Sequence, residues 1–334
     1  MVGSNAVQRY SNLATRFNVI RKAITYSVFL GLAAVLMWVL YKDVSWENDL
    51  LPALKSVKWP WVFASFLFGY IATALRGLRW NIMLEPMGYH VRDWWAIHAV
   101  AFGYCMNNLI PRSGELARCT LLNRTDQVPV NKLIGTVLLE RIVDIAMLAS
   151  LVFLAFVLET EAFNSFFEHA DGSKGTTILV LLGAAIAAFA IFLYMLKKFE
   201  HIPFFKKVRE FFLGMMDGLK SIFRLKRSFL FWLYSFGIWF FWLLMTFTSL
   251  LALQETCAMT LRQTVFFMAA GSLGMMVPTP GGAGAFHGMA ILSLQALGFP
   301  LAAGKIYALI SWSIKTTWDI LVGAVSFLIA TTKK

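Results

Sequence analysis

The chain has 334 residues, of which 59% are hydrophobic and only 14% are charged. A soluble domain carries roughly 25% charged residues, so this composition excludes an ordinary globular protein. The net charge of +12 would favour nucleic acid as the partner of a soluble protein, but here the basic residues gather in a few connecting segments. That distribution is typical of cytoplasmic loops in contact with anionic membrane lipids, and we expect no nucleic-acid partner.

Eight apolar segments follow a basic tail at residues 1–22. They predict an all-α polytopic membrane protein in which residues 1–334 form a single integral membrane domain. In chain order the segments cover residues 23–41, 59–75, 94–110, 133–158, 176–196, 229–253, 264–277 and 306–330.

The third and seventh segments are short, and each ends at a Pro-Gly hinge that breaks a helix. An apolar segment with ionisable residues follows each hinge. Charges and helix breakers are costly in lipid, so finding both twice in the same order indicates a pathway for a polar group. The hinge residues are Asn108, Pro111 and Gly114 in the first hinge and Pro278, Pro280, Gly281, Gly282 and Gly284 in the second.

The distribution of loop charges decides between two topologies. If all eight segments cross the bilayer, the connection 197–227, which holds nine basic residues, falls outside and the acidic loop 159–171 falls inside. Both placements violate the positive-inside rule. They are corrected if the third and seventh segments are re-entrant helical hairpins, the first returning through residues 115–122. We therefore predict six full transmembrane helices plus two re-entrant hairpins, with both termini cytoplasmic; eight full spans are the alternative.

The same scheme predicts an inverted repeat, with residues 1–158 and 176–330 as its halves. Inverted repeats with broken helices are a common transporter design. Aligning Asp144 with Asp319 also places Glu140 opposite Lys315. Residues 201–227 alternate aromatic and basic residues at helical spacing, which predicts a cytoplasmic interfacial amphipathic helix, with an ordinary connector as the alternative.

Charged residues around the first hinge are candidates for binding a lipid headgroup. Arg112 and Arg118 suit a phosphate near the N-terminus of a helix that starts after the hinge. Glu115 shares a helical face with Arg118, so the alternative is a Glu–Arg network that only holds the hairpin.

Three further candidates lie in the fourth segment: Glu140, Arg141 and Asp144. Two carboxylates four residues apart repel each other, so a cation must compensate them, and we expect Arg141 or an arginine of the first hairpin. The cluster either forms a polar cavity wall or is a buried structural ion cluster. Arg76 and Arg79 are expected to be snorkelling anchors, with an interfacial headgroup contact as the alternative.

In the second half, His287, Lys315 and Asp319 are the candidates. His287 could be a headgroup donor or proton relay, or a structural histidine. Lys315 and Asp319 could contact substrate or simply pair with each other. No catalytic, metal-binding or cofactor motif is recognised, so we expect no enzyme, metal or cofactor.

These motifs together resemble the lysylphosphatidylglycerol synthase transmembrane-region family, which includes the flippase domain of the bacterial multiple peptide resistance factor. The resemblance implies a bacterial inner-membrane protein that moves polar or aminoacylated lipids between leaflets, without the soluble synthase domain. Two positions differ from the family pattern, His287 for a glutamate and Lys315 for an arginine. The residues that carry the resemblance are Arg79-Trp80, Asn108, Pro111, Gly114-Glu115, Arg118, Glu140-Arg141, Asp144 and Pro278-x-Pro280-Gly281-Gly282-x-Gly284.

We therefore expect a flippase-like transporter whose partners are a phospholipid substrate and anionic membrane lipids. An intramembrane enzyme acting on a lipid-linked substrate, with Glu140, Asp144 or His287 as acid or base, is one alternative. A non-transporting membrane partner whose polar core only fixes the fold is another. The lipid, the direction and energy source of transport, and the oligomeric state stay open.

Overall fold

The structure is a computed structural model that describes residues 27–171, 198 and 225–332. Four helices in these ranges are long and apolar enough to cross a membrane. They are α3 (Trp59–Leu84), α6 (Val130–Leu158), α10 (Ser228–Leu251) and α13 (Leu301–Thr332). The protein is therefore a multi-pass α-helical membrane protein, and four of the six predicted spans have helices of the required length.

The first predicted span is described only in part. A helix over Ser27–Tyr41 is followed, after a bend of 75°, by the helical residues Trp46–Lys55. Only the two pieces together are long and apolar enough to cross a membrane, as one broken span. The second piece comprises η1 (Trp46–Leu50) and α2 (Leu51–Lys55). The predicted span 176–196 lies outside the described residues, as does all but the end of the predicted interfacial helix 201–227. Residues 225–227 form a bend and turn before α10.

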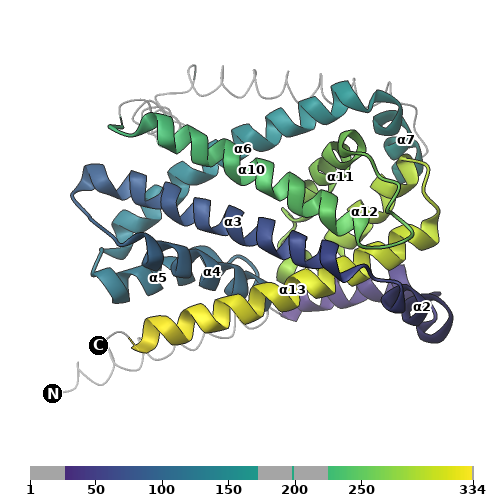
Figure 1. Ribbon diagram of the computed structural model, residues 1–334, viewed down its shortest axis with the longest axis horizontal. Helices are drawn as coiled ribbons and strands as arrows, with labels where there is room; N and C mark the ends of the chain where they lie inside the picture. Colours follow the sequence, from purple (N-terminus) through teal and green to yellow (C-terminus); the bar gives the residue numbers. More distant parts are fainter. Residues whose placement is uncertain (1–26, 172–197, 199–224, 333–334) are drawn as a thin grey trace.

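Two helical hairpins replace the third and seventh apolar segments (Figure 1). The first consists of α4 (Asp93–Leu109) and α5 (Gly114–Asp126), and the second of α11 (Leu261–Gly274) and α12 (Ala285–Ala296). The longest of the four, α4, has 17 residues, whereas a span needs about 20. Each hairpin bends at its predicted Pro-Gly sequence.

The two hairpins occupy opposite halves of the molecule. In Figure 1, α4 and α5 lie in the left half, and α11 and α12 in the right half. We call the left end, with loops 85–92 and 127–129, the α5 end, and the right end, with loops 252–260 and 297–300, the α2 end. The short helices η2 (Glu85–Met87) and α7 (Thr160–Asp171) lie in the connections at the α5 and α2 ends, respectively.

Helix contacts cross between the two halves of the chain. The central α3 lies along α10, the hairpin helix α4 packs against α13, and the hairpin helix α11 packs against α6. Small residues permit the closest approaches. A Cβ on Gly323 of α13 would come within 2.8 Å of the Ala101 oxygen of α4, so this crossing has room only for glycine.

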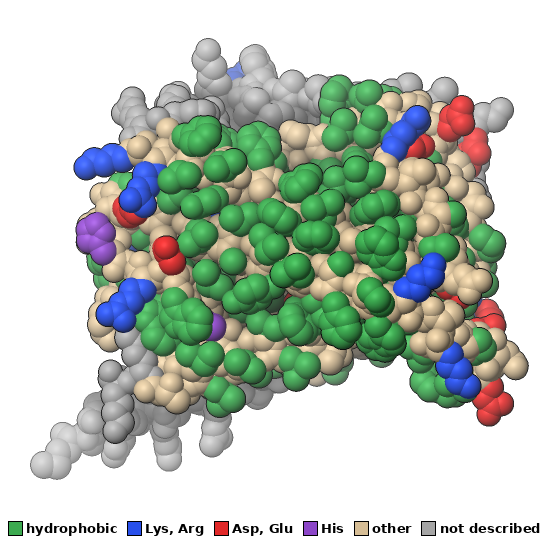
Figure 2. Space-filling view, viewed as in Figure 1, with side chains coloured by type: hydrophobic (Ala, Val, Ile, Leu, Met, Phe, Trp, Pro, Cys, Tyr) green, Lys and Arg blue, Asp and Glu red, His purple; other side chains and the backbone are tan. Residues whose placement is uncertain are grey.

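The outer surface matches a bilayer. Hydrophobic side chains cover the middle of the face in Figure 2, whereas charged side chains gather toward its two ends. Large apolar residues such as Phe63, Phe153 and Leu328 are more than 60% exposed, which would be costly in water and is favourable against acyl chains.

Candidate functional site

The two hinges meet at the tips of the hairpins. Arg112, in the first hinge, donates from Nη2 to the Met276 oxygen of the second hinge at 3.2 Å. Its backbone has a φ of 59°, an uncommon conformation for a residue with a side chain. A Cβ on Gly281 would collide with Oδ1 of Asn108, so the tips of both hairpins are in direct contact.

Side chains satisfy the broken backbone of the first hinge. The helix after the hinge begins at Gly114, as predicted, and the Gly114 N–H donates to Asn107 Oδ1 at 2.8 Å. The Ser113 hydroxyl donates to the carbonyl oxygens of Met106 and Ile110, each at 2.9 Å. Asn107 therefore occupies one of the free donors that we expected for an anion, a contact that sequence reasoning missed.

Positive φ angles set the path of the second hinge. Gly281, Gly282 and Gly284 have φ of 55°, 75° and 79°, which only glycine adopts without strain. Trp312 of α13 fixes the turn by donating from Nε1 to the Gly281 oxygen at 2.7 Å. His287 accepts the Gly284 N–H at Nδ1, at 3.2 Å, and thereby caps α12.

His287 is fully buried and packed edge-on or tilted against aromatic rings. Its ring centre lies 5.6 Å from that of Tyr41 and 5.2 Å from that of Trp312. Its Nε2 is buried and has no hydrogen-bond partner within residues 27–171, 198 and 225–332. The cap gives the histidine a structural role. Because Nδ1 accepts, the neutral ring carries its proton on Nε2, which can donate to a further group.

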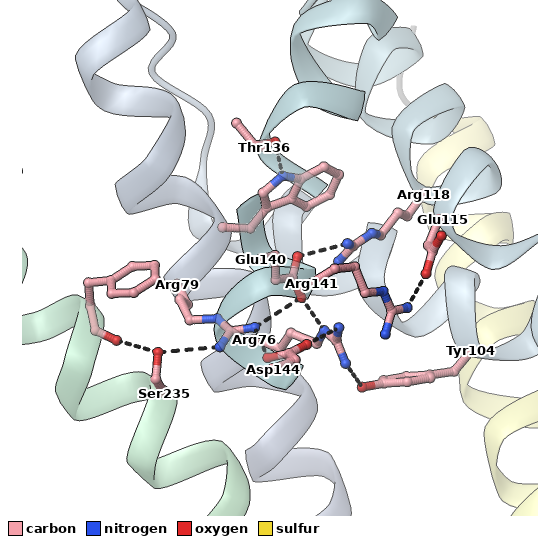
Figure 3. Close-up of polar contacts among 12 residues, drawn as sticks. Arg76, Arg79, Tyr104, Glu115, Arg118, Thr136, Glu140, Arg141, Asp144 and Ser235 are labelled. Carbon is pink, nitrogen blue, oxygen red and sulfur yellow. Dashed lines mark hydrogen bonds and ion pairs between the residues drawn. The ribbon is translucent and has the colours of Figure 1, made fainter. Parts of the chain in front are cut away.

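A buried ion cluster lies beside the first hairpin (Figure 3). Glu140 is at its centre, with Oε1 at 2.5 Å from Arg76 Nε and 3.1 Å from Arg79 Nη2. Its second oxygen, Oε2, accepts from Arg118 Nη2 at 2.7 Å. Asp144, one turn further along α6, accepts from Nη2 of Arg76 and of Arg79, each at 2.9 Å.

The cluster contains one more cation than anions. All five residues are at most 9% exposed, and together they comprise three arginines and two carboxylates. Tyr104 and Ser235 accept further arginine hydrogen bonds at 3.1 and 3.3 Å. The Nε atoms of Arg79 and Arg118 are nevertheless buried without a partner among the described residues. A buried positive charge with spare donors favours an additional anion.

The expectation that Arg76 and Arg79 are snorkelling anchors is wrong. They are 5% and 0% exposed and point into the protein, where they pair with both carboxylates of α6. The physical reason is charge balance, because Glu140 and Asp144 on one helical face need more than one cation. That requirement was the signal in the sequence that could have identified them.

Glu115 and Arg141 form a separate ion pair outside the cluster. The expected compensation of Glu140 therefore comes from Arg118 of the first hairpin, together with the α3 arginines, and not from Arg141. The side chains of Glu115 and Arg141 are 39% and 44% exposed, although Arg141 lies near the middle of the 29-residue α6. An open ion pair at that depth is costly in hydrocarbon.

Lys315 and Asp319, the candidates in the last span, lie beside the first hinge and outside the buried cluster. Lys315 Nζ pairs with Asp319 Oδ2 at 2.6 Å, as the alternative of a mutual pair predicts. Asn108 Nδ2 also donates to Asp319 Oδ2, at 3.4 Å. The first hinge therefore contacts α13 as well as the second hinge.

Trp80 supports the cluster and was not a candidate in its own right. Its Nε1 donates to Thr136 Oγ1 at 2.8 Å, and the Arg118 guanidinium lies 4.7 Å from the centre of its ring. The ring thus orients Arg118 through a cation–π contact. Its position directly after Arg79 was part of the resemblance, without an assigned role.

A known family model matches almost the whole chain. The model of the lysylphosphatidylglycerol synthase TM region matches residues 24–323, most of the 334-residue chain. The chain belongs to this family. Among curated proteins, no relative matches it. Both hinges and all charged candidate residues of this lysylphosphatidylglycerol synthase TM region lie inside the matched range.

Proposed function

We propose that the protein is a flippase-like transporter that moves a polar or aminoacylated phospholipid between the leaflets of the bacterial inner membrane, with both termini in the cytoplasm. Membership of the lysylphosphatidylglycerol synthase TM-region family supports a role with membrane lipids. We propose in addition which class of lipid is the substrate and that the protein moves it between leaflets.

One observation carries the proposal: two broken hairpins meet tip to tip beside a buried cluster with a surplus positive charge. Non-helical backbone at membrane depth is tolerated where protein buries it or where it lines a wet cavity. The contact of Arg112 with the Met276 oxygen places a guanidinium at the junction of the hinges. A lipid phosphate is the anion that a membrane supplies.

The helix packing supports an inverted repeat. Each hairpin lies against the last span of the other half, α4 against α13 and α11 against α6, while α3 lies along α10. A two-fold exchange of the halves would produce this pattern. In such transporters one repeat rocks against the other around a central site.

The exposed Glu115–Arg141 pair supports a lateral opening for the headgroup. A zwitterionic or aminoacylated headgroup carries a phosphate and an amine, and these groups can exchange partners with the arginine and the glutamate. The headgroup would pass along the hinges while its acyl chains stay in lipid. This exchange needs no chemical conversion of the lipid.

Leaflet exchange in reconstituted liposomes tests the proposal. Purified protein is incorporated with fluorescent phosphatidylethanolamine, phosphatidylglycerol or aminoacylated phosphatidylglycerol, and the fraction of probe accessible to a membrane-impermeant quencher is followed. We expect exchange for at least one headgroup, and a loss of it in Arg118→Gln. The matched control is Arg262→Gln, since Arg262 is a 63% exposed side chain that pairs with Glu159 far from the hinges.

Exchange no faster than in protein-free vesicles, for all three headgroups, would refute the proposal. Mass spectrometry of the extracted lipid separates transport from catalysis, because a changed lipid mass would favour an intramembrane enzyme. If Arg118→Gln exchanges lipid normally, the surplus charge has no part in the path.

A further inference from the structure

A second polar site lies at the α5 end, apart from the hinges. It is a pocket of about 860 Å³, bounded by the end of α3 with η2, the first turns of α6 and residues 225–227. This volume lies in the range of small-molecule sites, roughly 300–1,000 Å³.

The rim of the pocket is positively charged. Lys132, Lys226, Arg227 and the exposed His90 line it, together with a single acid, Glu85. Arg227 neutralises Glu85 at 3.0 Å. Lys132 and Lys226 have no ion-pair partner in the part of the chain that the structure describes. The rim therefore presents two uncompensated cations.

The N-terminus of α6 adds to the positive electrostatic potential of the rim. The helix begins at Val130 after Pro129, which has no side chain that can cap it. Asn131 and Lys132 of the first turn line the pocket, and Asn131 Oδ1 accepts the Lys132 N–H at 3.0 Å. The helix dipole favours an anion at this point.

The wall of the pocket is apolar. Ile82 and Met83, each 4% exposed, contribute to this wall, as do Met87, Leu139 and Leu225. A soluble phosphate would gain nothing from this surface, whereas the glycerol and upper acyl region of a lipid would bury it.

We propose that this pocket binds the phosphate and glycerol region of an anionic phospholipid. Cations above an apolar wall, at the end of transmembrane helices, match the order of groups in such a lipid. The inference goes beyond leaflet exchange, because a lipid can occupy the pocket whether or not it moves. Thr136 lines the pocket and accepts the hydrogen bond of Trp80. A lipid in the pocket would therefore contact the residue that holds Trp80, whose ring in turn orients Arg118.

A glycine offers a direct steric test. A Cβ on Gly135 would meet no atom within 4 Å, and Gly135 lines the pocket. The Cβ of Gly135→Leu therefore lies in open space, the rest of the side chain occupies pocket volume, and the substitution improves helix propensity. The matched control is Gly31→Leu, because Gly31 has equally open surroundings on another helix.

The charge test uses exposed lysines. Lys132→Ala with Lys226→Ala removes the uncompensated cations, and the matched control, Lys55→Ala with Lys58→Ala, removes two exposed lysines at the α2 end. All variants keep buried contacts intact, so none of them should lower the thermal midpoint.

The probe is phosphatidylglycerol with a photoreactive diazirine high on one acyl chain, at trace level in phosphatidylcholine nanodiscs that hold the full chain. Peptide mass spectrometry locates the crosslinks. We expect crosslinks in the pocket-lining segments 82–90, 131–139 and 225–227. Both pocket variants should lower this yield by about tenfold, while both controls keep it. The lysine double variant loses the attraction of two surface cations for an anionic lipid, and Gly135→Leu occupies the space that the lipid would fill.

Three outcomes would overturn the inference: equal capture of a phosphatidylcholine probe at these segments, loss of capture on adding glycerol 3-phosphate, or unchanged capture in the lysine double variant. Glycerol 3-phosphate competition would assign the pocket to soluble phosphates. Since crosslinking requires no leaflet exchange, failure of the transport proposal and failure of this one are distinguishable.

Discussion

Arg118 Nη2 donates a 2.7 Å hydrogen bond to Glu140 Oε2, and this contact joins the first hairpin to α6. The two residues are 4% and 0% exposed, so water cannot replace either partner. The position of the hairpin and the charge of the buried cluster therefore depend on each other. If α5 moved away, Glu140 would keep only the α3 arginines as partners. Arg118 would then be a buried cation that needs another anion.

Neutralising Glu140 should destabilise the protein. In Glu140→Gln, three buried arginines face one carboxylate, and removing one member of a buried ion pair costs about 3–5 kcal/mol. Chemical denaturation in detergent micelles measures the free energy of unfolding. Glu161→Gln, on exposed surface of α7, is the control and should change it by less than about 0.5 kcal/mol. A Glu140→Gln protein as stable as the control would show that the arginines are not held by this carboxylate.

The exposed Glu115–Arg141 pair should matter for transport more than for stability. In the water-filled opening that we propose, the Glu115–Arg141 pair is solvated like a surface ion pair, so Arg141→Ala should lower the free energy of unfolding by less than about 1 kcal/mol. We expect leaflet exchange to slow by about tenfold, as loss of roughly 1.4 kcal/mol of interaction with the passing headgroup would produce. The fluorescent-lipid assay in liposomes measures it.

The double reversal Glu115→Arg with Arg141→Glu is the control for this pair, because it restores opposite charges at the same positions. Exchange should return in part. A large loss of stability in Arg141→Ala, with exchange per folded protein unchanged, would assign the pair a purely structural role.

The second hairpin should tolerate substitution of a glycine in α12 and not of a glycine in the hinge. Gly281 has a φ of 55°, and its Cβ would collide with Asn108, so Gly281→Ala should cost about 1–3 kcal/mol of unfolding free energy. Gly288 lies in α12, where a Cβ would meet no atom within 4 Å, and Gly288→Ala should be neutral or stabilising by up to about 1 kcal/mol. Thermal unfolding in detergent compares the two. Equal effects would mean that the hinge contact is absent in the membrane.

Cysteine labelling tests the proposed topology. Cys105 and Cys119 are buried, so only the partly exposed Cys257 needs replacement by serine. Arg124→Cys and Glu161→Cys then lie near opposite ends of α6. We expect an impermeant maleimide to reach Arg124→Cys only from the cytoplasmic side and Glu161→Cys only from outside, in vesicles of defined orientation. Labelling of both from one side would refute the arrangement of the first hairpin.

The sequence by itself determined the features that depend on local chemistry. Pro111 and Gly114, and the glycines at positions 281, 282 and 284, break the helices where the structure breaks them, because backbone angles follow from the residue at each position. Apolar length identified α3, α6, α10 and α13 as spans, since the thickness of a bilayer fixes the length of a helix that crosses it. The spacing of Lys315 and Asp319 on one helix allowed their pairing as one of two alternatives, and the structure has the pair.

Only the tertiary structure decided which charges meet. Arg76 and Arg79 reach Glu140 and Asp144 because α3 and α6 lie close together, a relationship that no local pattern encodes. Asn107 caps α5, and Trp80 supports Arg118, for the same reason. A buried charge must find its partner in space, and the distance along the chain does not limit which partner that is.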